Sequence, residues 1–277
     1  GVSPLVTPSV AGIRVGKNHY RSFTLQFHYD IGPDEVVFDS SGVDLYVTDK
    51  LRRFDVGLIQ LGDPLVGSAG RPVGAGLNRH SFVCPPQCTR TAMKAPVLHV
   101  FRRSHHMHAY GMHMVTTQYD SAGRVKRSDT LEFFDFGASS APEVRSVGAG
   151  STITRGDWWT VKCTYRVPEQ VAPEKRPVFG YKSQSEMCID FVFYYPMQRN
   201  MNKCGPQLPV SKIVAMGMSL PGLEVPNWIA ESLPSMSSRH YASVPGNDFS
   251  CFGRYNGSQA LGDANELHRK FGAASLS

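Results

Sequence analysis

Apolar residues in this 277-residue chain alternate with polar ones in short runs instead of recurring at helical spacing. Runs of this kind, bounded by Gly, Pro, Asp and Ser, are typical of half-buried β-strands. No segment before residues 227–233 shows a comparably strong helical pattern. We therefore predict an all-β fold, a jelly-roll-like antiparallel β-sandwich. Its strands are expected at residues 20–30, 42–48, 54–62, 97–101, 112–120, 157–165 and 188–196.

The composition is that of a globular protein with a substantial core, since 41% of its residues are hydrophobic. The formal net charge is +6, but the basic residues are scattered in pairs such as Arg52-Arg53, so we expect no nucleic-acid partner. No apolar run approaches the roughly 18 to 20 residues that would span a bilayer, and no transmembrane segment is expected. The chain begins without Met or a leader pattern, which predicts a processed protein or a piece of a longer one.

Six cysteines have fifteen possible pairings, and their spacing alone does not choose among them. A zinc cluster is the alternative, but the close pair in "CPPQC" (residues 84–88) has no matching second pair, so disulfides are favoured. Disulfides indicate an oxidising compartment: secreted, in the lumen of the secretory pathway, or at the cell surface. Asn256, in the sequon Asn-Gly-Ser, is a candidate glycosylation site and fits this location.

Histidines cluster in "RRSHHMHAYGMHM" (residues 102–114), which holds four of the ten in the chain. In a strand, a period of two places His106 and His108 on one face and His105 and Met107 on the other. Two imidazoles on one face can bind a single metal ion, although an exposed polar strand explains the same pattern. The third ligand would select the metal: a carboxylate favours zinc or iron, and a thioether favours Cu(I).

Several motifs, in order, resemble the copper type II, ascorbate-dependent monooxygenases, and more their dopamine β-hydroxylase branch than their peptide-amidating branch. "HHMHAYG" (105–111) is followed some eighty residues later by "SEMCIDFVFYYP" (185–196). "SSGVDLYVTDKLRRFDVGLIQLG" (40–62) resembles the stretch that joins the two catalytic domains, and "CPPQC" has the cysteine spacing of that branch. The resemblance covers nearly all of residues 13–205 and thins towards the C-terminus.

The resemblance implies an oxygen-activating copper held by His106, His108 and Met187. It implies disulfides Cys84–Cys204, Cys88–Cys251 and Cys163–Cys188. "LQFHYD" resembles the strand carrying the third ligand of the electron-transfer copper, which gives His28, but the adjacent His-His pair of that site has no counterpart in this chain. Residues 1–50 are then expected to be the C-terminal part of the first β-domain, residues 51–205 the second domain, and residues 206–277 an extension tied back by a disulfide.

The implied activity is hydroxylation of an unactivated C–H bond of a small molecule, with dioxygen as co-substrate and ascorbate as reductant. The complete enzyme would hold two coppers, of which one is expected in this chain, and the missing half or another chain would pack on residues 13–48. The carboxylate-gripping Arg and Tyr of the amidating branch correspond to Ser104 and Phe191, which disfavours a peptide substrate. Asp190 is a nearby carboxylate that could face the core or the surface. The alternative function is a non-catalytic extracellular structural or interaction module with the same fold, with or without copper.

Overall fold

The structure is a computed structural model that describes residues 4–17, 19–23, 36–63, 73–134, 144–146, 150–179, 184–199, 201–206 and 249–251. Strands dominate this part of the chain, which confirms the predicted all-β class. They are β1 (Ala11–Gly12), β2 (Phe54–Asp55), β3 (Gly57–Asp63), β4 (Gly76–Cys84), β5 (Val97–His106), β6 (Gly111–Tyr119), β7 (Val125–Leu131), β8 (Val144–Ser146), β9 (Thr152–Thr154), β10 (Trp158–Val167), β11 (Cys188–Tyr195), β12 (Lys203–Pro206) and β13 (Phe249–Cys251).

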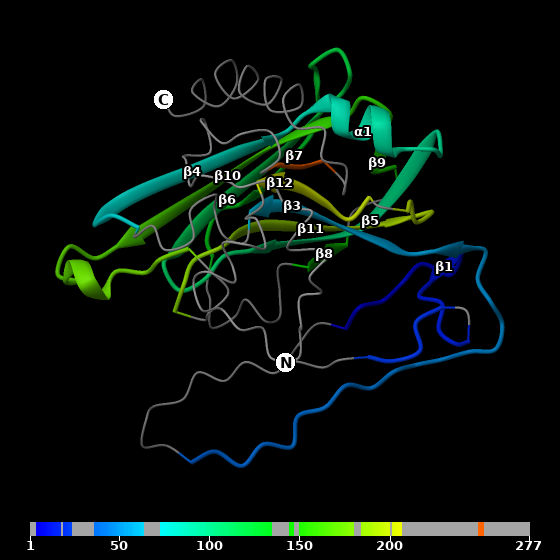
Figure 1. The fold of residues 1–277 in the computed structure, drawn as a ribbon, viewed down its shortest axis with the longest axis horizontal. Helices are drawn as coiled ribbons and strands as arrows, with labels where there is room; N and C mark the ends of the chain where they lie inside the picture. Colours follow the sequence, from blue (N-terminus) through cyan, green and yellow to red (C-terminus); the bar gives the residue numbers. More distant parts are fainter. Residues whose placement is uncertain are drawn as a thin grey trace, which may run out of the picture.

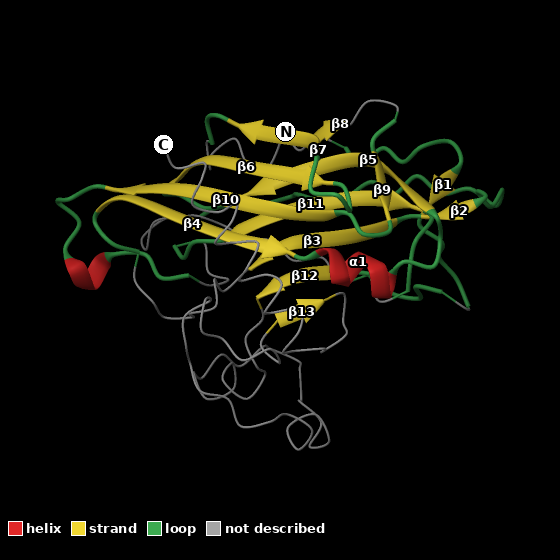
Figure 2. Ribbon diagram, turned by 90° about the horizontal axis from the view of Figure 1, so that it is seen from above, coloured by secondary structure: helices red, strands yellow, loops and turns green. Residues whose placement is uncertain are grey.

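Two sheets form the sandwich, and Figures 1 and 2 show their strands running together along the long axis of the molecule. The smaller sheet has the order β4-β10-β6-β7, and the larger one has the order β13-β12-β3-β11-β5-β8, with β9 also paired to β5. The long neighbours are antiparallel, and β12 joins β3 in parallel. Strands β5 and β11 are neighbours in the larger sheet, so residues 99–106 lie beside residues 189–195.

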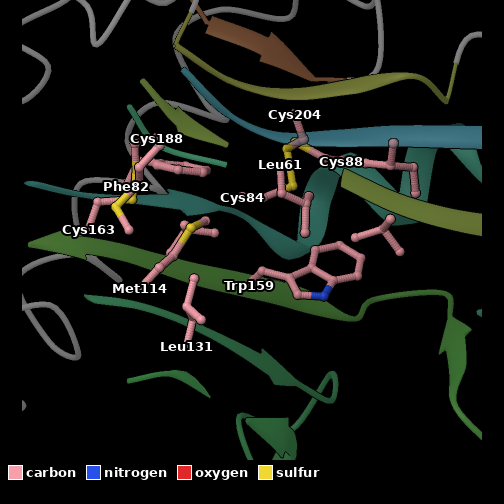
Figure 3. Packing of buried hydrophobic residues seen from close by; sticks show 14 of the residues in the cluster. Leu61, Phe82, Cys84, Cys88, Met114, Leu131, Trp159, Cys163, Cys188 and Cys204 are labelled. Atoms are coloured by element: carbon pink, nitrogen blue, oxygen red, sulfur yellow. A yellow bond between two sulfur atoms is a disulfide. The ribbon is translucent and has the colours of Figure 1, made fainter. Parts of the chain in front are cut away.

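The core lies between the two sheets and follows the period of two that the sequence predicts for half-buried strands. Along β10, the fully buried residues are Val161, Cys163, Tyr165 and Val167, and the residues that alternate with them are more exposed. Figure 3 shows Leu61 of the larger sheet in the same packed layer as side chains of the smaller sheet. Burial of each large apolar side chain contributes roughly 1.5–3 kcal/mol.

Disulfides connect the two sheets. Cys84 on β4 is bonded to Cys204 on β12, and Cys163 on β10 is bonded to Cys188 on β11 (Figure 3). These are two of the three pairs that the family resemblance implies. A disulfide of this kind contributes about 2–4 kcal/mol, chiefly by restricting the unfolded chain.

The sulfur of Cys88 lies close to this pair, since the sulfur atoms of Cys84, Cys88 and Cys204 are all within 4.8 Å of one another. Cys88 is itself disulfide-bonded, so none of these three sulfurs is a thiolate that could hold zinc. Its expected partner, Cys251, lies in β13 opposite Cys204 in the strand register. The pairing of Cys88 with Cys251 stays a prediction.

One element was not predicted and one expected strand is absent from the described residues. Residues 86–92 form a helix, α1, in the "CPPQC" segment, and Pro86 occupies its first position, where the missing N–H costs nothing. Residues 42–48 alternate as a strand does but form none, since no other described strand pairs with them. The predicted strand at 20–30 falls largely outside the described residues, and so do His28, the helix at 227–233 and Asn256.

Residues 36–51 run as an extended stretch (Figure 1). Several of its large apolar side chains are exposed to solvent. Phe38 and Tyr46 are each 96% exposed. The chain is anchored on either side of this stretch, because β1 pairs with β2 and the Arg52 guanidinium donates hydrogen bonds to the hydroxyl of Thr7 and the carbonyl of Ala11. Exposed aromatic and aliphatic side chains in one continuous stretch are unusual on a protein surface.

Candidate copper site

The two histidines of the His-x-His pair meet at the end of a strand. His106 is the last residue of β5, and His108 lies in the turn that leads to Gly111 at the start of β6. Their Nε2 atoms are 3.1 Å apart, and the two rings stand at 90° to each other. His106 is half-buried and His108 is buried. The structure therefore brings these two predicted ligands together.

A backbone carbonyl fixes the tautomer of His108. Its Nδ1 lies 2.7 Å from the carbonyl oxygen of Ser185, and because a carbonyl only accepts, Nδ1 must carry the proton. The neutral ring then has its lone pair on Nε2, the atom that faces His106. Metal-binding histidines are commonly held by a hydrogen bond of this kind from the other ring nitrogen.

Glu186 holds the backbone of the same turn. One of its carboxylate oxygens accepts the N–H of His108 at 3.0 Å, and the other accepts the N–H of Tyr110 at 2.7 Å. Burial raises the pKa of Glu186 to about 7, although the hydrogen bonds from the backbone N–H groups of Tyr110, His108 and Met187 act in the opposite direction. The segment before β11 is thus attached to the histidine turn through a side chain as well as through the carbonyl of Ser185.

Met187 follows directly and is 7% exposed. Its carbonyl accepts a hydrogen bond of 2.7 Å from the hydroxyl of Tyr165 on β10. The next residue, Cys188, is bonded to Cys163 on that same strand. The main chain around Met187 is therefore fixed to both sheets, while the two residues before it contact the histidine turn.

The opposite face of β5 points into the sandwich. His105 is 6% exposed, with its Nε2 3.4 Å from Thr116 Oγ1 and 3.9 Å from a carboxylate oxygen of Asp190. Asp190 is fully buried and forms an ion pair with Arg103. Of the two orientations that the sequence leaves open for Asp190, the structure has the one that faces the core.

Phe191, one residue further, lies on the face of the sheet that carries His106. It is paired in register with Ser104, and its ring centroid is 5.9 Å from that of His106. Ser104 and Phe191 thus lie side by side next to the histidine pair. By the resemblance, they stand where the peptide-amidating branch has Arg and Tyr, and here one is small and polar and the other is apolar. Neither of these two side chains could bind a peptide carboxylate as a cation.

Sequence reasoning did not single out Glu186, Ser185 or Tyr165. Glu186 had one available signal, since it is an acidic residue directly before the proposed ligand Met187 and at the start of an apolar strand. Ser185 acts through its carbonyl, which every residue type possesses, so its identity carries no signal.

Comparison with known proteins identifies the family. Residues 55–216, more than half of the chain, match the family described as "Copper type II ascorbate-dependent monooxygenase, C-terminal domain". The chain belongs to this family. It is 27% identical over 258 residues to dopamine beta-hydroxylase of Equus caballus, an alignment that covers 90% of this chain and 40% of that protein.

Two further relatives of this chain are similar at the same level. Dopamine beta-hydroxylase of Homo sapiens is 28% identical over 215 residues, with 74% of this chain and 32% of the relative covered. MOXD1 homolog 1 of Drosophila melanogaster is 25% identical over 211 residues, with 76% and 29% covered. The chain thus spans between about a third and two fifths of the length of these curated relatives.

The residues at the histidine turn fit the copper that the family name implies. Metal–nitrogen bonds of about 2.0 Å allow one ion to reach two Nε2 atoms 3.1 Å apart. The tautomer of His108 places a lone pair on its Nε2, the atom that would coordinate the ion, and imidazole suits copper. Within the described residues, none of the helices is long and apolar enough to cross a lipid bilayer.

Proposed function

We propose that this chain is the oxygen-activating part of a secreted copper monooxygenase that hydroxylates a C–H bond of a small substrate. The observation that carries the proposal is the pair of Nε2 atoms at His106 and His108, with the tautomer of His108 set by the carbonyl of Ser185, two residues before Met187. Met187 is the proposed third ligand, because a soft thioether beside two imidazoles favours Cu(I).

Copper would supply the binding of dioxygen and its one-electron chemistry, with two electrons drawn from ascorbate. One oxygen atom would enter the C–H bond and the other would leave as water. The protein positions the parts: Glu186 and Ser185 hold the histidine turn, and Tyr165 holds the main chain of Met187. The half-buried ring of Phe191 beside His106 gives the substrate an apolar surface.

The complete enzyme needs a second copper and therefore a preceding domain. We propose that residues 1–50 are the end of that domain, residues 51–205 the oxygen-activating domain and residues 206–277 an extension. His28 would be the third ligand of the electron-transfer copper. The exposed side chains of Phe38 and Tyr46 support a contact between residues 13–48 and the preceding half of the protein.

Copper titration and turnover of the longer protein test the proposal together. The chain as given should bind one equivalent of Cu(I) under anaerobic reducing conditions. A protein extended by its preceding domain should consume oxygen with ascorbate and hydroxylate a small probe. Dopamine and tyramine are suitable probes, because relatives are named for them. Copper binding without hydroxylation of any small probe would favour the non-catalytic interaction module instead.

A further inference from the structure

A buried cluster of charges lies directly behind the histidine turn. Arg103 on β5 donates from Nη2 to Asp190 on β11 and from Nη1 to Asp129 on β7. The side chains of Arg103 and Asp190 are 5% and 0% exposed. Arg127, nearer the surface, donates to both oxygens of Asp129 at 2.7 Å. One guanidinium thus joins two neighbouring strands of the larger sheet to the smaller sheet.

Stability does not explain this arrangement. In the described part of the chain, Asp190 Oδ1 and Arg103 Nε are buried without a hydrogen-bond partner. Buried charges lose their hydration, and a pair with unfilled hydrogen-bonding capacity recovers little of that loss. Apolar side chains of similar size would fill the same space as well. Such pairs are better suited to specifying one arrangement among competing ones.

A competing arrangement exists because β5 is irregular just before the pair. Tyr194 is opposite Val100 while Phe193 is opposite Arg102, so Phe101 is an extra residue in β5. This β-bulge reverses the parity of the strand: Val100 faces the core before it, and Arg103 and His105 face the core after it. A slip of one residue would exchange the two faces, and His105 would replace His106 on the outer face.

We propose that the Arg103–Asp190 ion pair is a register lock, which selects His106 over its neighbour His105 for the copper site. Arg103 lies three residues before His106, and Asp190 lies three residues after Met187, so the pair fastens together the two segments that carry the proposed ligands. The inference rests on the proposed function. Arg103 and Asp190 are positioning residues that act through the strand register.

The first test needs no copper. Histidine carbethoxylation by diethyl pyrocarbonate, followed residue by residue by mass spectrometry, should label exposed His99 readily in the wild-type chain and spare buried His105. Asp190→Asn should raise the labelling rate of His105 at least about fivefold, because the unlocked strand exposes its inner face. Arg103→Lys is the milder variant: a lysine cannot bridge two carboxylates in a fixed fork, so the same change is expected at smaller amplitude.

Asp157→Asn is the matched control. Asp157 is also fully buried and ion-paired, with its carboxylate 2.6 Å from the Lys126 ammonium, but it lies in the turn between β9 and β10, and β9 pairs with the opposite end of β5. Its replacement should destabilise the fold without exposing His105. Protection of His105 in Asp190→Asn and Arg103→Lys equal to that in the wild type would overturn the register lock.

The second test uses Cu(I). X-ray absorption of the copper-loaded chain should show nitrogen and sulfur ligands in the wild type and in Asp157→Asn. Asp190→Asn should lose sulfur scattering and bind Cu(I) at least about tenfold more weakly. Substitution of residues that orient metal ligands commonly lowers metal affinity by this much. Unchanged affinity and scattering in Asp190→Asn would overturn the link to the site. A wild-type chain that binds no Cu(I) would overturn the proposed function, while the labelling pattern would still decide the register.

Discussion

His108 Nδ1 lies 2.7 Å from the carbonyl oxygen of Ser185, a residue 77 positions away in the chain. This contact joins the turn after β5 to the segment before β11, and it leaves the Nε2 lone pair of His108 directed at His106. A copper site needs both effects, since its ligands come from distant segments and must be deprotonated on the coordinating atom.

Replacing any proposed ligand by alanine should abolish stoichiometric Cu(I) binding. One of the three donors is removed in each of His106→Ala, His108→Ala and Met187→Ala. Substitution of residues that only orient metal ligands lowers metal affinity roughly 10- to 100-fold, so we expect larger losses here. Anaerobic Cu(I) titration with a competing chelator measures the effect. His106 is half-buried, so the folded state should survive its loss with little change in stability.

The control for this series is His99→Ala. His99 is exposed on the same strand and stacks on Tyr195, with ring centroids 5.1 Å apart, away from the turn. His105→Ala, which the sequence suggests as the control, would instead disturb the buried cluster around Asp190. One equivalent of Cu(I) bound by all three alanine variants would show that the ligands lie elsewhere.

Gly111→Ala should weaken copper binding without removing a ligand. A Cβ at Gly111 would lie 2.6 Å from the Cβ of Met107 and 3.1 Å from the carbonyl oxygen of His108, so the turn must shift. Overpacking of this kind costs about 1–3 kcal/mol. Urea denaturation and Cu(I) titration should both report the loss.

Gly42→Ala is the matched control, because nothing lies within 4 Å of a Cβ built at Gly42. It should leave both the unfolding midpoint and the copper affinity unchanged. A Gly111→Ala chain that binds Cu(I) as tightly as Gly42→Ala would mean that the conformation of the turn does not set the affinity.

Strand patterning was informative wherever a strand has a regular period and a partner. The alternation around residues 105–108 correctly placed His106 and His108 together on one face, with His105 and Met107 on the other, which the structure shows to be buried in the core. It did so although residue 107 lies beyond the end of β5, because the turn keeps the alternation for two more residues. The alternation alone therefore predicted that the two histidines lie together, without knowledge of the tertiary fold.

Features that depend on tertiary contacts could not be predicted in this way. The bulge at Phe101 appears only when β5 is aligned with β11, and the ion pair of Asp190 with Arg103 depends on the same tertiary pairing. The role of Glu186 depends on backbone N–H groups nearly eighty residues away. Residues 42–48 show the reverse failure, since their pattern is that of a strand but no described strand pairs with them.

Cys88 and Cys251 should form the third disulfide. Cys88 is oxidised, no described cysteine is free, and β13 brings Cys251 beside β12. Peptide mapping without reduction should recover these two cysteines in one linked pair of peptides. Replacing both by alanine should lower the free energy of unfolding by about 2–4 kcal/mol. Recovery of a free thiol, or of a Cys84–Cys88 bridge, would contradict the scheme.

Acid should weaken the fold through Asp129, which connects the two sheets. Burial by itself would raise the pKa of this carboxyl, but hydrogen bonds from Arg127 and Arg103 and their positive charges outweigh it, so the pKa lies below its ordinary value. Below the unfolded pKa of about 4, the unfolded chain takes up the proton before the folded chain does. The stabilisation is therefore complete above about pH 4 and is lost as the pH falls through the folded pKa.

Asp129→Asn should remove this part of the pH dependence. At pH 7 the variant should be less stable than the wild type by roughly 1–3 kcal/mol, the usual contribution of hydrogen bonds to charged groups. The difference should shrink as the pH falls from 4 towards the folded pKa, because a wild-type carboxyl that takes up its proton pairs no better than an amide. Urea denaturation at pH 7, 4 and 2 measures it, with the exposed Asp44→Asn as a control that should follow the wild type. A stability difference that stays constant from pH 7 to pH 2 would show that Asp129 acts by packing and not by its charge.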